Sequence, residues 1–287
     1  MKPDAVARAE RILGTEAENW ARVVSRGYSI NEHWTAGFAD GSRAFLKLAS
    51  VDPSPQWVRD ERHVFACVSG PFMPRFLGFE DGEQPLLILE DMLPDARWPP
   101  PWHPGDVDAV LAALAEVAAA PLAGALPRLV DTWDGEGWPV VAADPAPFLS
   151  LGIISAQWLV ESLPALLDAS GRTPLAGESL VHGDVRSDNL CLRSERAVLL
   201  DWNHARVGNP AFDVACWLPS LVLEGGPPPE SFGVDEFAAL VAGYFAANAG
   251  LAAPTGAPRV RAFQRAQLEV ALPWACRTLG LPLESAV

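Results

Sequence analysis

Three polar residues that could bind a metal ion lie in one short segment of the sequence. Asp184, Asn189 and Asp201 stand there among apolar residues. The apolar runs 190–192 and 197–200 are separated by the polar turn Arg-Ser-Glu-Arg, a pattern that predicts a β-hairpin. Because a hairpin brings its ends together, Asn189 and Asp201 should lie close in space, with Asp184 entering at the same end. An amide and two carboxylates suit Mg²⁺, which prefers oxygen ligands.

The order of these residues matches what phosphoryl transfer requires. One carboxylate must orient an attacking hydroxyl and accept its proton, while an amide and a second carboxylate hold Mg²⁺ on the phosphates. We therefore predict Asp184 as the catalytic base, and Asn189 and Asp201 as the metal ligands. Arg186 could neutralise the transferred phosphoryl group as a second catalytic residue, although a surface ion pair would explain it almost as well.

The same segment resembles the catalytic loop and the metal-binding aspartate of protein kinases. Residues 182–189 read HGDVRSDN in place of H-R-D-x-x-x-x-N, and Asp201 is followed by Trp and Asn in place of D-F-G. With the G-x-P-x-x-D-x-A pattern at 208–215, the sequence is similar to the aminoglycoside phosphotransferase and choline-kinase-like family of small-molecule kinases. The resemblance implies a protein-kinase-like fold in which His182 and Asp213 hold the catalytic loop.

A lysine in the N-terminal half extends the pattern. Lys2 and Lys47 are the only lysines, and Lys47 lies inside an apolar predicted strand. A compact ammonium group there suits a nucleotide phosphate, and its position resembles the third-strand lysine of kinases. A lysine that snorkels from an edge strand is the alternative. Glu61, in the middle of a predicted helix, is the expected counter-ion of Lys47, with Asp60 as the competing choice.

The resemblance is weakest in the loop that would cover the phosphates. Protein kinases use G-x-G-x-x-G there, whereas residues 25–31 contain a single glycine. Gly27, Ser29 and Asn31 could still cradle phosphates through backbone N–H groups and short polar side chains. An ordinary turn between two strands is the alternative interpretation of this loop.

A hinge is predicted where the apolar run 86–89 ends. Glu90, Asp91 and Met92 follow this run, and a proline-rich segment begins at Pro94. Backbone groups around Glu90 and Met92 would then meet the edge of the adenine, and we assign both residues to the nucleotide site.

These elements predict an α+β, bilobal protein-kinase-like fold. The N-terminal nucleotide-binding lobe, residues 1–93, would hold an antiparallel sheet with a helix, and residues 94–287 would form a mostly helical lobe for catalysis and acceptor binding. In the first lobe we expect helices at 4–24 and 55–69 and strands at 33–38, 43–49, 75–80 and 85–90. In the second we expect helices at 107–120, 148–169, 232–249 and 258–279, with an irregular segment at 126–147.

The composition excludes several classes of protein. A net charge of −15 argues against nucleic acid and anionic membranes as partners, because both are negatively charged. No apolar run reaches the roughly 18 residues that a membrane-spanning helix needs. The four cysteines lack C-x-x-C spacing and the first residues are charged, which favours reduced thiols, no signal peptide and a cytoplasmic location. The oligomeric state stays open.

The sequence therefore predicts Mg²⁺-dependent transfer of the γ-phosphate of ATP or GTP to a hydroxyl of a small molecule. An aminoglycoside-like antibiotic, a choline-, homoserine- or sugar-type metabolite, and a non-catalytic nucleotide-binding pseudokinase all stay open. Residues 94–287 contain 11 Lys and Arg against 22 Asp and Glu. This excess, with Trp133 and Trp138 in the acidic loop 131–144, suits a cationic acceptor; a role in solubility is the alternative.

Overall fold

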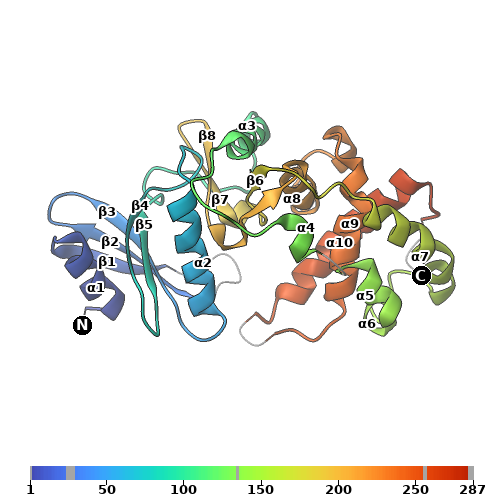
Figure 1. Cartoon of the computed structure of the whole chain (residues 1–287), viewed down its shortest axis with the longest axis horizontal. Helices are drawn as coiled ribbons and strands as arrows, with labels where there is room; N and C mark the ends of the chain where they lie inside the picture. The colour runs from blue at the N-terminus through green and yellow to red at the C-terminus, as the bar shows by residue number, and fades with distance from the viewer. Residues whose placement is uncertain (1, 24–29, 134–135, 255–256, 284–287) are drawn as a thin grey trace. The chain divides into compact units, whose positions relative to one another are not determined.

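The computed structural model describes residues 2–23, 30–133, 136–254 and 257–283 (Figure 1). Two compact units are formed, each from two stretches of chain. The first unit comprises Met1–Leu126 and His182–Ala205, and the second comprises Pro127–Val181 and Arg206–Val287. The predicted lobe boundary at residue 93 stays a prediction.

A five-stranded antiparallel sheet, with strand order β1-β2-β3-β5-β4, forms the centre of the first unit. Its strands are β1 Ala17–Val23, β2 Glu32–Phe38, β3 Arg43–Leu48, β4 Phe76–Glu80 and β5 Leu86–Glu90. Three helices belong to the same unit: α1 Asp4–Leu13, α2 Ser54–Cys67 and α3 Asp106–Ala119. A hairpin of β7 Leu190–Arg193 and β8 Arg196–Leu199 completes it, flanked by the 3₁₀ turns Ser187–Asn189 and Trp202–His204.

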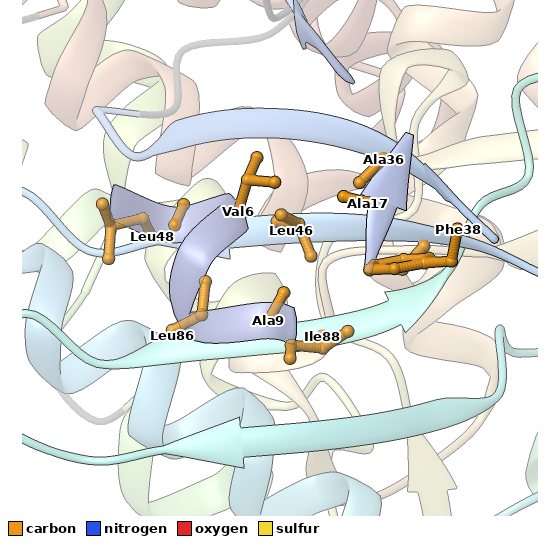
Figure 2. Packing of buried hydrophobic residues seen from close by; sticks show 11 residues of the cluster. Val6, Ala9, Ala17, Ala36, Phe38, Leu46, Leu48, Leu86 and Ile88 are labelled. Atoms are coloured by element: carbon orange, nitrogen blue, oxygen red, sulfur yellow. The ribbon is translucent and has the colours of Figure 1, made fainter. Parts of the chain in front are cut away.

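Helix α1 covers one face of this sheet. Its residues Val6 and Ala9 pack on side chains from β3 and β5, which Figure 2 shows at close range. The helix ends at Leu13 because Gly14 takes the left-handed conformation, with φ 71°, and donates its N–H to the carbonyl of Glu10. The predicted helix over 4–24 was therefore wrong beyond Leu13, since strand β1 begins at Ala17.

The opposite face of the sheet carries the polar residues of interest. Side chains alternate along a strand, so Leu46 and Leu48 point towards α1, whereas Lys47 points the other way. Leu87 of β5 is the cross-strand neighbour of Lys47 and packs in a cluster with Val58 of α2. Helix α2 thus lies on the face to which Lys47 points.

The second unit is mostly helical. Besides the two-stranded pair of β6 Ser179–Val181 and β9 Arg206–Gly208, it contains α4 Leu129–Thr132, α5 Trp138–Ala143, α6 Ala146–Leu149, α7 Ala156–Gly171, α8 Ala211–Leu223, α9 Ala238–Ala249 and α10 Val260–Leu279. The 3₁₀ turns Pro229–Ser231 and Asp235–Phe237 join α8 to α9. The predicted class, with an N-terminal antiparallel sheet and a helical C-terminal part, is confirmed.

Three sequence-based expectations fail in this second unit. The segment 126–147, expected to be irregular, contains α4, α5 and the start of α6. The predicted helix 148–169 is broken at Gly152, with φ 66°, and α7 starts afresh after Ser155, whose Oγ accepts the N–H of Trp158. Trp138 is a core residue instead of part of a binding loop. It is fully buried, and its Nε1 donates to the carbonyl of Ala239 at 2.8 Å.

None of the helices in the described ranges is long and apolar enough to cross a membrane. In the described ranges Cys67, Cys191, Cys216 and Cys276 form no disulfide bond.

Candidate active site

The structure brings the predicted lysine and glutamate together. Lys47 Nζ, from β3, lies 2.6 Å from Glu61 Oε2, from the middle of α2. Both side chains are buried, with exposed fractions of 7% and 1%. The competing candidate, Asp60, points elsewhere and accepts a hydrogen bond from Gln56 Nε2.

Asp201 is the second partner of the same ammonium group. Its Oδ1 lies 2.7 Å from Lys47 Nζ, although the two residues are 154 positions apart. Asp201 occupies the left-handed region, with φ 63°, which is uncommon for residues other than glycine, although Asp and Asn adopt it more often than most. At this sharp turn the next peptide N–H, of Trp202, donates to Glu61 Oε1 at 3.2 Å. Glu61 therefore holds both the lysine and the turn.

One positive charge is thus shared between two carboxylates. Burial lowers the pKa of Lys47, but the charges of Asp201 and Glu61 outweigh it, so that the pKa is raised above its usual value. Burial also raises the pKa of Asp201, but the charge of Lys47 and its hydrogen bond lower the pKa to about 2. In Glu61 burial dominates and the pKa is raised, with Lys47 opposing. Lys47 and Asp201 are therefore both charged at neutral pH.

Asp184 and Asn189 meet in the loop that precedes the β7–β8 hairpin. Asn189 Nδ2 donates to the backbone carbonyl of Asp184 at 3.0 Å and to its Oδ2 at 2.7 Å. The carbonyl of Asn189 accepts the N–H of Leu200 at 2.7 Å, so the two ends of the hairpin meet as predicted. Since both Nδ2 bonds fix the amide, its Oδ1, the atom that a cation would use, faces away from Asp184.

His182 ties this loop to the end of the hairpin. Its Nδ1 accepts the N–H of Asp184 at 3.3 Å, so the proton sits on Nε2, which lies 3.0 Å from the carbonyl of Leu200. Burial lowers the pKa of His182 to about 4, against the opposing charge of Asp184, and the ring is neutral. Gly183, with φ 84°, is required here because a Cβ would overlap the carbonyl oxygen of His204.

Arg186 lies between two carboxylates of the same loop. Its guanidinium makes two hydrogen bonds of 3.0 Å to Asp188 and lies 3.6 Å from Asp184 Oδ2. Burial lowers the pKa of Arg186, but Asp184 and Asp188 raise it above its usual value. The sequence analysis missed Asp188, which holds Arg186 beside the predicted base. The i, i+2 spacing of opposite charges in an extended loop was the available signal.

The predicted phosphate-covering residues are placed only in part. Gly27 and Ser29 lie outside the described residues. Asn31 Oδ1 accepts a hydrogen bond from Ser54 Oγ at the start of α2, and that same Oγ accepts the N–H of Ser50. Asn31 therefore anchors the end of this loop to α2, and its predicted contact with phosphates stays a prediction.

The predicted hinge residues are packed against the hairpin. Glu90 makes ion pairs with Arg193 at 2.7 Å and Arg75 at 3.3 Å. Met92 is buried in a cluster with Cys191 and Val198. The side chain of Glu90 is thus used within the protein, which leaves backbone atoms as the predicted adenine contacts. Asp213 belongs to the second unit, and its predicted role at the catalytic loop stays a prediction.

The donor set fits Mg²⁺ better than a metal held by protein alone. No group of three or more His, Cys, Asp or Glu side chains within the described ranges could hold a metal ion. Mg²⁺ commonly takes one or two protein oxygens and completes its octahedral shell with water and substrate phosphates. Asn189 and Asp201 are the predicted pair of oxygen ligands, and their role at a metal ion stays a prediction.

Comparisons with known proteins identify the family and the fold of the chain. The model of the phosphotransferase enzyme family matches residues 21–263. A thermostable mutant of aminoglycoside phosphotransferase APH(4)-Ia, in complex with ADP and hygromycin B, is 13% identical with a TM-score of 0.60, over 99% of this chain and 100% of that one. An aminoglycoside phosphotransferase from Alicyclobacillus acidocaldarius is 17% identical with a TM-score of 0.58, over 97% of this chain and 95% of that one. A macrolide 2'-phosphotransferase from Brachybacterium faecium is 16% identical with a TM-score of 0.57, over 99% of this chain and 100% of that one.

At these identities the solved structures establish the fold, and the predicted protein-kinase-like architecture is confirmed. A comparison of the sequence with curated proteins gave no match. The family model spans most of the sequence, and with it the prediction of an enzyme, a small-molecule kinase, is confirmed. The chain belongs to the phosphotransferase enzyme family.

Proposed function

We propose that the protein transfers the γ-phosphate of ATP, bound with Mg²⁺, to a hydroxyl group of a small molecule. The observation that carries this proposal is the buried ammonium of Lys47 between Glu61 and Asp201, in the same unit as the Asp184–Asn189 pair. ATP is favoured over GTP because similar structures contain adenine nucleotides: ADP with hygromycin B, ADP with spectinomycin, and AMP-PNP with amicoumacin.

In the proposed reaction the acceptor hydroxyl attacks the γ-phosphorus. The new oxygen–phosphorus bond forms as the bond between the γ-phosphorus and the β–γ bridging oxygen breaks, and ADP leaves. Asp184 orients the hydroxyl and accepts its proton. The two bonds from Asn189 hold Asp184 in place, so little reorientation is needed when the acceptor binds.

The remaining residues act on the nucleotide. Lys47 binds phosphate oxygens while Glu61 holds its ammonium group in position. Asn189 and Asp201 would hold Mg²⁺, which would neutralise phosphate charge. Arg186 lies 3.6 Å from Asp184, close enough to meet negative charge on the transferred group. A pseudokinase is disfavoured because the lysine, its glutamate, the base and the metal ligands are all present.

For the acceptor we propose a polyhydroxylated small molecule of the antibiotic or amino-sugar kind, with a metabolite as the alternative. Proteins of similar fold act on macrolides, bind hygromycin B or are named fructosamine-3-kinase. A cationic acceptor is supported by the acidic second half and by Trp133, which is half-buried beside Phe212 and Tyr244, with ring centroids 5.1 and 5.4 Å apart. The use of ATP, and cysteines that form no disulfide bond in the described ranges, fit the proposed cytoplasmic location.

The test is ATP turnover with a panel of aminoglycosides, macrolides, amino sugars, choline and homoserine. Each reaction is analysed by mass spectrometry for a product one phosphate heavier than the acceptor, with Asp184→Asn as the matched inactive control. We expect at least one acceptor to be phosphorylated by the wild type only. Nucleotide binding without any acceptor-dependent turnover would favour the pseudokinase.

A further inference from the structure

His33 lies beside Lys47 on the same face of the sheet. The two residues are cross-strand partners in the β2–β3 register, and partners in register project to the same side. On the other side of β2, His33 pairs with Val23, the last residue of β1. His33 and Val23 are thus the first residue pair after the loop between β1 and β2. The predicted phosphate-covering residues belong to that loop.

The imidazole of His33 is buried beside the active-site charges. Its exposed fraction is 7%, and its ring centroid lies 5.2 Å from that of Phe45. Burial and the charge of Lys47 lower the pKa of His33 to about 4, with Asp201 opposing. The ring is therefore neutral at physiological pH, and the charges of Lys47 and Asp201 both affect it.

One ring nitrogen of His33 is unpaired within the described part of the chain. Its Nε2 is buried and has no hydrogen-bond partner there. An unpaired buried polar atom costs free energy, so such atoms are rare and are commonly completed by a ligand or by water. Phe or Leu would fill the same space without this cost, so a polar nitrogen at this place suits a bound ligand that the described residues do not replace.

We propose that His33 is a further nucleotide-binding residue, which donates a hydrogen bond from Nε2 to a phosphate oxygen of ATP. This inference rests on the proposed function, which puts the phosphates of ATP at Lys47. Phosphate is favoured over adenine as the partner because His33 is level with Lys47 along the strands, whereas the predicted hinge lies beyond Glu90, which pairs with Ala44 at the other end of β3.

The test compares two replacements of His33. His33→Phe keeps an aromatic ring against Phe45 but removes the nitrogen, whereas His33→Gln keeps an N–H donor at a similar distance from the backbone. Trp34→Phe, on the same strand but facing α1, is the matched control. Calorimetry with Mg²⁺ measures the Kd of ATP, ADP and adenosine for each protein.

We expect His33→Phe to weaken ATP binding by about 10- to 100-fold, as for the loss of one hydrogen bond to a charged group. Adenosine affinity should not change, and His33→Gln should recover most of the loss. Without nucleotide, the Tm of His33→Phe should equal or exceed that of the wild type, because the unpaired nitrogen is gone. The rise in Tm on adding ATP should be smaller than in the wild type.

Equal losses for ATP and adenosine, or no loss for ATP, would overturn the role of His33. If Lys47→Met weakens ATP binding while His33→Phe does not, only this inference fails and the proposed function stands. If the wild type binds no nucleotide, both fail together.

Discussion

Removing the charge of Lys47 should destabilise the protein because it leaves two carboxylates facing each other. Nζ lies 2.6 Å from Glu61 Oε2 and 2.7 Å from Asp201 Oδ1, so these oxygens are at most about 5.3 Å apart. With an effective dielectric constant of about 20, two negative charges at that distance repel each other by about 3 kcal/mol. Lys47→Met should therefore lower the free energy of unfolding by roughly 3–5 kcal/mol at pH 7, the range for breaking a buried ion pair.

A second substitution should restore part of this loss. In Lys47→Met with Glu61→Gln, the repulsion is removed, while the glutamine carbonyl can still accept the N–H of Trp202. The double variant should thus be more stable than Lys47→Met by about 2–3 kcal/mol. Urea unfolding of all four proteins in the cycle, followed by circular dichroism, measures these values.

Acidification provides an independent check with a defined sign. In the wild type Lys47 lowers the pKa of Asp201 to about 2, so the stability that this pair provides is complete above about pH 4 and is lost as the pH falls towards 2. In Lys47→Met the pKa of each carboxylate should instead be raised. The two charged carboxylates then destabilise the variant at neutral pH, and their protonation removes this destabilisation as the pH falls. The difference in the free energy of unfolding between the wild type and Lys47→Met should become smaller from pH 7 to pH 4. Two results would refute the description of Lys47 as a cation shared by Glu61 and Asp201. One is that Glu61→Gln destabilises Lys47→Met further, and the other is that the difference in free energy of unfolding becomes larger in acid.

Three further outcomes test the catalytic loop. Asp184→Asn should lower kcat by about 10²- to 10⁴-fold with an unchanged Kd for ATP, because the base acts on the acceptor; a wild-type rate in steady-state assays would contradict this role. Asp201→Ala should abolish the part of ATP affinity that depends on Mg²⁺, which calorimetry with and without Mg²⁺ would measure; an undiminished Mg²⁺ effect would remove Asp201 from the metal site. Gly183→Ala should lower the free energy of unfolding by at least about 1 kcal/mol, because φ is 84° and the Cβ would overlap the carbonyl of His204; denaturant unfolding at wild-type stability would contradict that overlap.

The sequence predicted the residue types of the site better than their contacts. Glu61 was predicted as the partner of Lys47 because it lies in the middle of a predicted helix and resembles the glutamate of the Lys–Glu pair of kinases. Asp188 was missed because it occupies an unspecified position of the catalytic-loop pattern, and His33 because it belongs to no motif and meets Lys47 only through strand pairing. A short charged loop leaves many pairings open until its backbone path is known.

Element boundaries were missed where one residue overrides a periodic pattern. The apolar spacing of residues 4–13 does not reveal that Gly14 ends the helix, since glycine also occurs within helices. Trp138 was assigned to a binding loop because the surrounding residues are acidic. Its burial depends on Gly243, where a Cβ would come within 2.7 Å of the indole ring, and no local pattern shows that contact.

The ion pair between Lys47 and Asp201 has a consequence for how the chain folds during its synthesis. It joins residues 154 positions apart, and the first unit recruits residues 182–205 only after the chain has left it at Leu126. Contacts of such long sequence separation form late, because a large loop must close before they contribute. A ribosome must therefore complete residues 127–181 of the second unit before the pair of Lys47 and Asp201 can form. Until then the nascent chain holds Lys47 and Glu61 without Asp201, and added ATP should protect from proteolysis only chains that extend beyond residue 205.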